Sequence, residues 1–175
     1  RGGARLTLAA IGARYEITRE RVRQIEAGAL VIARKNARHE IVQEFGMCGA
    51  ELLRVAGGAE REAVFIRALR EATGEIVPEK DFLNPARFAL ELSGRAFPFG
   101  EDDAFHAFWY VSKDDLGRVR RVTDKLSALA KERKQSLLGG QERFESLVAQ
   151  AAKAFNTGTD VLMRVALLSK KFAMS

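Results

Sequence analysis

The chain has 175 residues, of which 47% are hydrophobic and 30% are charged, and its formal net charge at pH 7 is +6. This length fits one domain or two to three small ones. The apolar stretches 27–33 and 161–168, the second of which is interrupted by Arg164, fall short of the roughly 18 residues of a membrane span, which excludes a transmembrane protein. The single cysteine, Cys48, excludes an internal disulfide, and with two distant histidines it provides no zinc ligand set. We therefore expect a cytoplasmic protein without a metal or other cofactor. Because the chain begins with Arg and has no leader-like start, it is expected to be a piece of a longer protein.

The charge is distributed unevenly along the chain. Residues 1–45 carry nine basic and five acidic side chains (+4), residues 46–111 carry seven and eleven (−4), and residues 112–175 carry thirteen and seven (+6). Because a phosphate backbone repels carboxylates and attracts guanidinium groups, the two ends are better candidates for nucleic-acid contact than the middle. We expect these same three ranges to form three structural units.

The first unit is predicted to be a helix-turn-helix. Helical apolar spacing indicates one helix over residues 7–15 and another over 19–33, with Glu16 and Ile17 in the turn and Thr18 as the cap of the second helix. Gly12 is small enough to allow close approach of the helices. The positions that such a motif buries hold apolar residues, namely Ile11, Tyr15, Ile17, Val22, Ile25 and Ala29.

The outer face of the second helix then carries polar side chains suited to reading bases. They are Arg19, Glu20, Arg23 and Gln24, with Arg21 at the flank. Arg can donate two hydrogen bonds to guanine, Gln can pair with adenine, and Glu can accept from cytosine in the major groove. The alternative is a solvated, salt-bridged helix face, but the fit of the buried positions favours DNA reading.

The stretch TLAAIGARYEITRERVRQIEAGAL, residues 7–30, resembles region four of bacterial primary sigma factors. The run T-R-E-R-V-R-Q-I-E-A after T-L-x-x-I-G is highly specific for that family, although it covers only a small part of the chain. The resemblance implies that Arg19, Glu20 and Gln24 contact base edges of a promoter element, that Arg21 and Arg23 hold phosphates or neighbouring bases, and that Thr18 caps the helix and touches the DNA backbone. In the family this region normally ends the polypeptide, so the long segment after Arg38 marks a departure from an ordinary sigma factor.

The middle unit is expected to contain two helices. The first begins near Glu60 and ends at Gly74, and the second begins near Asn84 and Pro85. The predicted buried side chains are Val64, Phe65 or Ile66, and Leu69 in the first helix, and Phe88, Leu90 or Ala89, and Leu92 in the second.

A β-hairpin is predicted next, because residues 95–113 alternate and are rich in aromatics around a turn at residues 100–103. Helices followed by a hairpin outline a winged-helix-like unit. Its tip carries Glu101, Asp102 and Asp103, which would repel phosphate, so we expect no DNA contact there. Asp102, Asp103 and His106 are too few and too exposed for a metal site, and the aromatic residues are expected to pack in the core.

The basic carboxyl-terminal unit begins with a predicted capping pair, Ser112 and Asp115, before a long helix that reaches Lys134. Its apolar positions are Leu116, Val119, Val122, Leu126 and Leu129, and its other face carries Arg118, Arg120, Arg121 and Lys125. Two further helices are expected over residues 144–155 and 160–172. The similarity of residues 90–99 to 166–174 suggests a degenerate second copy of the middle unit, and coincidence is the competing interpretation.

The fold expected from the sequence is mainly α, with a sigma-like helix-turn-helix, winged-helix-like and helical units, and one β-hairpin. No catalytic constellation is present, so the chain is not expected to be an enzyme. The predicted function is a bacterial, sequence-specific regulator of transcription that binds double-stranded DNA, with helical units for homodimerisation or RNA polymerase contact. The alternatives are the DNA-targeting part of a larger DNA-processing or defence protein, and a polymerase-binding sigma mimic.

Overall fold

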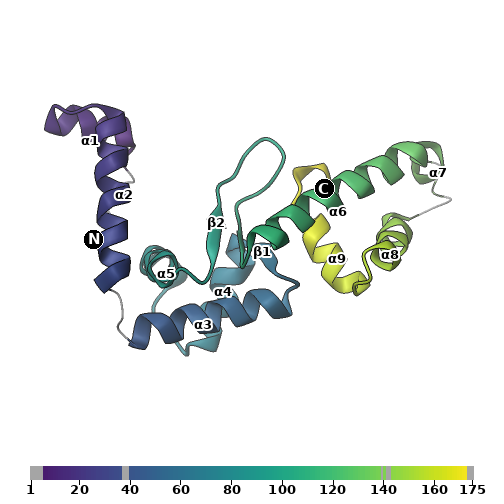
Figure 1. The fold of residues 1–175 in the computed structure, drawn as a ribbon. Helices are drawn as coiled ribbons and strands as arrows, with labels where there is room; N and C mark the ends of the chain where they lie inside the picture. The colour runs from purple at the N-terminus through teal and green to yellow at the C-terminus, as the bar shows by residue number, and fades with distance from the viewer. Residues whose placement is uncertain (1–5, 37–39, 139, 141–142, 173–175) are drawn as a thin grey trace.

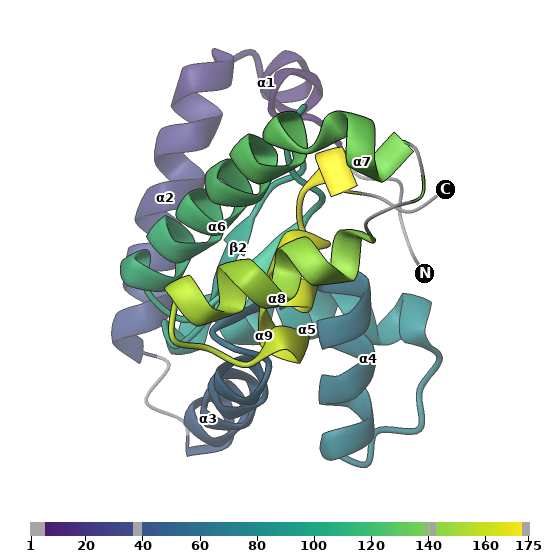
Figure 2. The ribbon, with the colours of Figure 1, turned by 90° about the vertical axis from the view of Figure 1, so that its right-hand side faces the viewer.

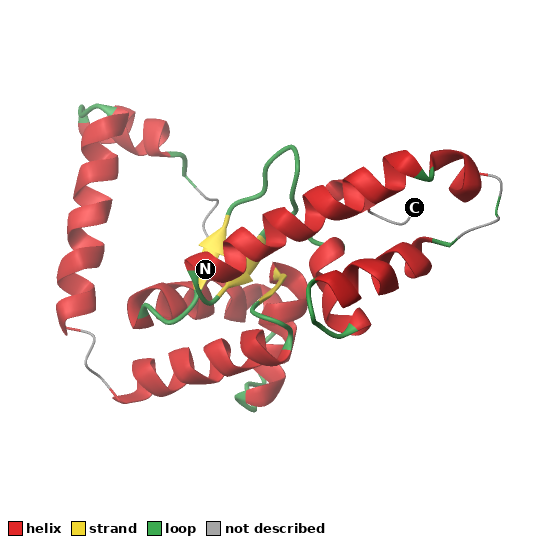
Figure 3. Ribbon diagram, turned by 45° about the vertical axis from the view of Figure 1, so that its right-hand side comes forward, coloured by secondary structure: helices red, strands yellow, loops and turns green. Residues whose placement is uncertain are grey.

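The computed structural model describes residues 6–36, 40–138, 140 and 143–172. The chain is mainly α, as predicted, with one small antiparallel sheet near the middle (Figures 1 and 3). The elements in chain order are α1 (Leu8–Tyr15), α2 (Arg19–Asn36), α3 (Glu40–Val55), β1 (Ala59–Arg61), α4 (Glu62–Ala72), α5 (Glu79–Ser93), β2 (Phe97–Phe99), β3 (Phe108–Tyr110), α6 (Lys113–Glu132), α7 (Lys134–Leu138), α8 (Phe144–Ala154), α9 (Thr159–Ala166) and a 3₁₀ turn, Lys170–Phe172. None of the described helices is long and apolar enough to cross a lipid bilayer.

The sheet has the strand order β1-β3-β2, with both outer strands antiparallel to β3. The predicted hairpin is confirmed as β2 and β3, which pair Phe97 with Tyr110 and Phe99 with Phe108. Strand β1 was not predicted, because the sequence placed Glu60 at the start of a helix. Three residues are too few to show the alternation by which a strand is recognised in a sequence.

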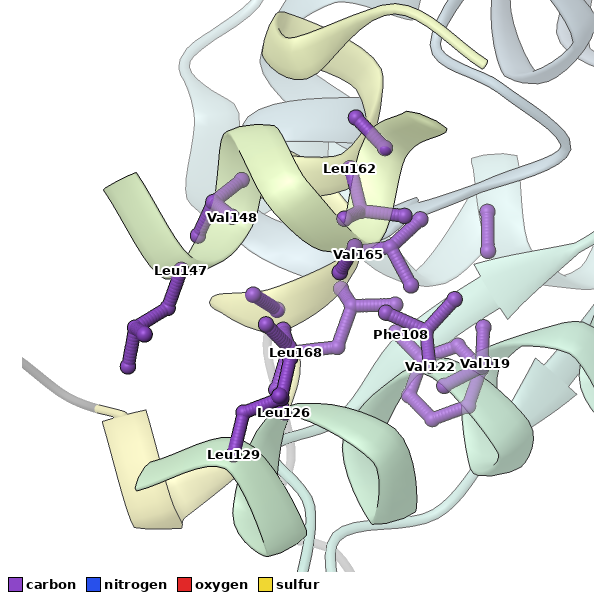
Figure 4. Packing of buried hydrophobic residues seen from close by; sticks show 14 residues of the cluster. Phe108, Val119, Val122, Leu126, Leu129, Leu147, Val148, Leu162, Val165 and Leu168 are labelled. Carbon is purple, nitrogen blue, oxygen red and sulfur yellow. The ribbon is translucent and has the colours of Figure 1, made fainter. Parts of the chain in front are cut away.

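The central strand β3 contributes to two separate hydrophobic cores, since successive side chains of a strand point to opposite faces. Trp109 packs with α3, α4 and α5, in a cluster of Leu53, Phe65, Ile66, Leu69, Phe82, Ala86, Leu90 and Ala96. Phe108 packs with α6, α8 and α9, in the cluster that Figure 4 shows. The division of the chain at residues 111 and 112 stays a prediction, and the sheet lines both cores.

Two expectations for the middle helices are wrong. In α4 the side chains of Phe65, Ile66 and Leu69 are buried, as expected, but Val64 is 49% exposed because it lies on the opposite face. Helix α5 begins at Glu79 instead of near Asn84, so that Pro85 lies inside it. Pro78 precedes the first turn, where Glu79 and Asp81 interact favourably with the helix dipole.

This earlier start changes which residues of α5 are buried. The buried side chains are Phe82, Ala86 and Leu90, whereas Phe88 is 55% exposed. Of the predicted set, Leu90 alone is fully buried, and Ala89 and Leu92 are half-buried. Pro85, which was expected at the start of the helix, is an interior residue.

The predicted cap of α6 is confirmed, because Ser112 Oγ accepts a hydrogen bond from the Asp115 N–H at 3.2 Å. The helix ends at Glu132, and the short α7 follows it. Helix α9 ends at Ala166 instead of continuing to Phe172, because the chain turns to pair Ser169 with Phe105 in the loop of the hairpin. The end of the described chain is therefore held against that loop.

Candidate nucleic-acid interface

The turn between α1 and α2 is defined by local hydrogen bonds that the sequence specifies. Thr7 Oγ1 accepts from the Ala10 N–H at 3.1 Å, and Thr18 Oγ1 accepts from the Arg21 N–H at 3.1 Å, so each helix starts at a threonine cap. Glu16 adopts the left-handed conformation, with φ of 56°, and ends α1. These contacts fix the angle at which α2 leaves the motif.

Gly12 is required by the closeness of this turn. A Cβ atom at residue 12 would lie 2.6 Å from the carbonyl oxygen of Ile17, which is closer than a carbon and an oxygen can approach. That carbonyl belongs to the backbone of the turn and cannot rotate away as a side chain would. The close approach expected at Gly12 is therefore confirmed, and the partner that approaches it is the backbone of the turn at Ile17.

The candidate DNA-contacting residues lie together on the first two turns of α2 or just before it. Thr18, Arg19, Glu20, Arg21, Arg23 and Gln24 are all exposed. Figure 1 places α1 across the amino-terminal end of α2, at the side of the molecule away from α6, α8 and α9, so that this end of α2 projects from the body. The structure thus leaves the predicted surface open to a large ligand.

The charges on this surface are partly paired with one another. Arg23 donates two hydrogen bonds to Glu20, Nε to Oε2 at 2.8 Å and Nη2 to Oε1 at 2.6 Å, and the side-chain amide of Gln24 donates a weaker one at 3.5 Å. The hydrogen bond from Arg23 is the main reason that the pKa of the Glu20 carboxyl lies below its usual value. Arg19, by contrast, forms no salt bridge with any residue that the structure describes. Its guanidinium is the cation most available to a base or a phosphate.

Three apolar positions that the motif was expected to bury are exposed. Tyr15 is 64% exposed, Ile25 is 51% exposed and Ala29 is also exposed, whereas Val22 is buried and Ile11 and Ile17 are half-buried. The physical reason is that α2 contacts only α1 and α5 extensively among the described helices, and these contacts leave about half of the Ile25 side chain exposed. Helical spacing predicts that these residues form one face, but it does not supply the element that covers the face.

The tip of the hairpin is less strongly anionic than its sequence suggests. Glu101 forms an ion pair with Lys170 at 2.8 Å, which holds the pKa of the glutamate below its usual value. Asp102 Oδ1 accepts hydrogen bonds from the N–H groups of Ala104 and Phe105, so it stabilises the loop. No group of three potential ligands gathers here or elsewhere in the described residues.

One of the four cations predicted on the outer face of α6 points inward instead. Arg118 Nη2 donates to Asp115 Oδ1 at 2.8 Å and to the carbonyl oxygen of Gly57. Arg120, Arg121 and Lys125 are exposed, as predicted. The contact with Gly57 could not be read from the sequence, because 61 residues separate the two partners.

Comparison with known proteins identifies only the amino-terminal part. No curated protein and no solved structure matches the chain. The family model of sigma-70, region 4, matches residues 1–32, which include α1 and most of α2. This segment of the chain is therefore a sigma-70 region 4 helix-turn-helix, a DNA-binding motif related to transcription.

Proposed function

We propose that the chain is a sequence-specific regulator of transcription that reads the major groove of double-stranded DNA with the start of α2. The observation that carries this proposal is the exposure of five polar side chains on the first two turns of a capped helix, within the segment that matches sigma-70 region 4. Side chains that point into solvent from the amino-terminal turns of such a helix can reach base edges. We further propose that these residues act in the cytoplasm and without catalysis.

The pairing on α2 suggests how the contacts are divided. Arg19 is free to donate two hydrogen bonds to a guanine. Glu20 holds the Arg23 guanidinium in place. The pair can therefore present a carboxylate acceptor of Glu20 and the remaining N–H donors of Arg23 to the DNA together. Arg21 donates to Gln24 Oε1 at 3.4 Å, a long hydrogen bond that a phosphate or an adenine can replace.

The unit from α3 to β3 is proposed to contact protein, either RNA polymerase or a second copy of the chain. Its helices and hairpin would suit the winged-helix-like unit expected of residues 46–111, but the first turn of α5 carries Glu79 and Asp81, which repel phosphate. Beside this turn lies an open hollow of about 320 Å³ with a mostly apolar lining. Its residues are Phe45, Glu75, Val77, Asp81, Phe82, Pro85, Ala86 and Ala89.

A sigma mimic that binds RNA polymerase through α1 and α2 is the second candidate. The exposed apolar side chains of Tyr15, Ile25 and Ile32 favour it, because they could pack against a protein surface. This candidate predicts binding to polymerase without any preference of the isolated chain for a DNA sequence.

The test is to select duplexes from a random library with the purified chain and to measure affinity for the selected and for a random sequence. Arg19→Ala should weaken specific binding by about 1–3 kcal/mol and relax the preference at one base pair. Lys35→Ala, which removes an exposed cation from the last turn of the same helix, is the matched control and should leave the preference unchanged. Failure to enrich any sequence, together with binding to polymerase, would favour the sigma mimic.

A further inference from the structure

The long helix α6 has no free apolar face. Val119, Val122, Leu126 and Leu129 are at most 6% exposed and point toward Leu147 and Val148 of α8 and toward Leu162 and Val165 of α9 (Figure 4). Figure 2 shows α6 lying along one side of α8 and α9, with its other side facing outward. Because α8 and α9 already cover the apolar side chains, α6 has no apolar seam for a second copy of the chain.

The outward side of α6 is cationic. Arg120, Arg121 and Lys125 are exposed, and none of them forms an ion pair with a residue in the described part of the chain. Asp124 is the acidic residue that lies among them on this side. Unpaired cations on adjacent turns of one helix create the positive potential that a phosphate backbone requires.

A neighbouring segment adds to this charge. Arg120 and Lys171 line the same open hollow of about 310 Å³, at the junction of α6 with the end of the described chain. Two carboxylates, Asp102 and Asp124, also line it, but Asp102 is already occupied by two backbone N–H groups. Lys171 therefore places one further cation beside Arg120, while the two carboxylates balance the charge of the hollow itself, so the cationic surface is the exposed side of α6.

The start of α6 is held firmly to the unit that precedes it. Arg118 bonds to the carbonyl oxygen of Gly57, and the Val111 N–H donates to the carbonyl oxygen of Gly58 at 3.1 Å. A cationic surface on a fixed helix loses less conformational freedom on binding than one on a mobile tail.

We propose that Arg120, Arg121 and Lys125 contact the phosphate backbone of the same duplex that α2 reads. The inference rests on the proposed function, because a single helix-turn-helix offers few phosphate contacts and needs others for stable binding. These three residues supply them from within one chain and place the basic unit on the DNA.

The experiment compares the salt dependence of binding to a selected duplex for the wild type and for the triple variant Arg120→Gln, Arg121→Gln, Lys125→Gln. Each phosphate contact contributes about 0.9 to the slope of log affinity against log salt, so the variant should lower that slope by about two to three units. The control triple, Arg54→Gln, Lys80→Gln, Lys153→Gln, removes the same charge from exposed residues on α3, α5 and α8 and should change the slope by less than about one unit. The charge-preserving variant Arg120→Lys, Arg121→Lys should keep the wild-type slope.

Two results would overturn the inference. One is equal slopes for both triple variants, and the other is a lower slope of the α6 triple variant with a single-stranded RNA of equal length but not with the duplex. Circular dichroism checks that each variant is folded. If the triple variant is not, the single variants Arg120→Gln and Lys125→Gln carry the test, and each should lower the slope by about 0.9. The failure of this inference is separable from that of the proposed function. If Arg19→Ala abolishes the sequence preference and the α6 variant has no effect, only the second contact is wrong.

Discussion

Helices α2 and α6 show the same amphipathic spacing in the sequence but differ in what covers them. In α6 the residues Val119, Val122 and Leu126 are at most 1% exposed, because α8 and α9 lie against them. In α2 the corresponding stripe begins with the buried Val22 and continues with Ile25, which is 51% exposed. The comparison shows that apolar periodicity identifies a face that can be buried, whereas the element that covers the face depends on chain topology.

The difference has a consequence for function. Helix α6 is part of a core, so its cationic side is held in one position by packing on the opposite side. Helix α1 packs against the first turns of α2, and α2 makes further contacts with α5, but much of α2 stands away from the body (Figure 1). The DNA-reading end of α2 is thus accessible, and its orientation depends mainly on the caps and the tight turn.

Paired truncations give the largest expected contrast between the two helices. Leu126→Ala removes a fully buried side chain from the core and should lower the free energy of unfolding by about 2–5 kcal/mol. Ile25→Ala removes a half-exposed side chain and should change it by no more than about 0.5 kcal/mol. Urea denaturation measures both values. A cost for Ile25→Ala that approaches that of Leu126→Ala would mean that Ile25 is covered in solution.

A glycine pair tests whether the tight turn controls the position of α2. Gly12→Ala places a Cβ against the Ile17 carbonyl oxygen and should cost about 1–3 kcal/mol, with loss of DNA binding. Gly28→Ala on α2 meets no atom within 4 Å and should stabilise the helix by about 0.5–1 kcal/mol. Amide hydrogen exchange in α1 and α2 reports the two effects separately from the rest of the protein. Similar exchange rates in both variants would show that the turn tolerates a side chain at residue 12.

The sequence was most informative where a structural feature depends on neighbouring residues. The caps at Thr18 and Ser112 follow from the hydroxyl group and the N–H three residues later, and both are present. The hairpin also lies where alternation and the turn at residues 100–103 placed it. Such features involve atoms that are close along the chain, so a local pattern is enough to predict them.

The features that were missed involve residues far apart in the sequence. Strand β1 exists because Ala59–Arg61 pairs with β3, some fifty residues later. Arg118 points inward because it bonds to Gly57, and Glu101 is neutralised by Lys170. In the candidate DNA interface, the residue types and their exposure could be predicted. The Glu20–Arg23 pair, which competes with contacts to DNA, belongs to the salt-bridged helix face that the sequence offered as the alternative.

The smallest expected effects on stability come from two glutamates, Glu60 and Glu20, whose pKa values are shifted in opposite directions. Burial raises the pKa of Glu60 above its usual value. The hydrogen bond from the Arg61 N–H and the Arg164 guanidinium at 3.8 Å lower this pKa, but burial outweighs them. The exposed Glu20 has a lowered pKa because Arg23 bonds to it. A raised pKa in the folded state contributes stability below the unfolded-state pKa and loses it as the pH rises. A lowered pKa contributes stability above the unfolded-state pKa and loses it as the pH falls through the folded-state value.

The stability of Glu60→Gln relative to the wild type should therefore increase as the pH rises from about 4 to about 7, since the wild type must then bury a charge. For Glu20→Gln the wild type should hold a small advantage near neutral pH that shrinks as the pH falls, because protonation removes the pair with Arg23. Urea denaturation of both variants over this pH range gives the two trends. Parallel trends for the two variants would show that Glu60 is hydrated in solution. They would also show that the open helix-turn-helix and the packed core do not differ in how their ionisable groups, Glu20 and Glu60, affect stability.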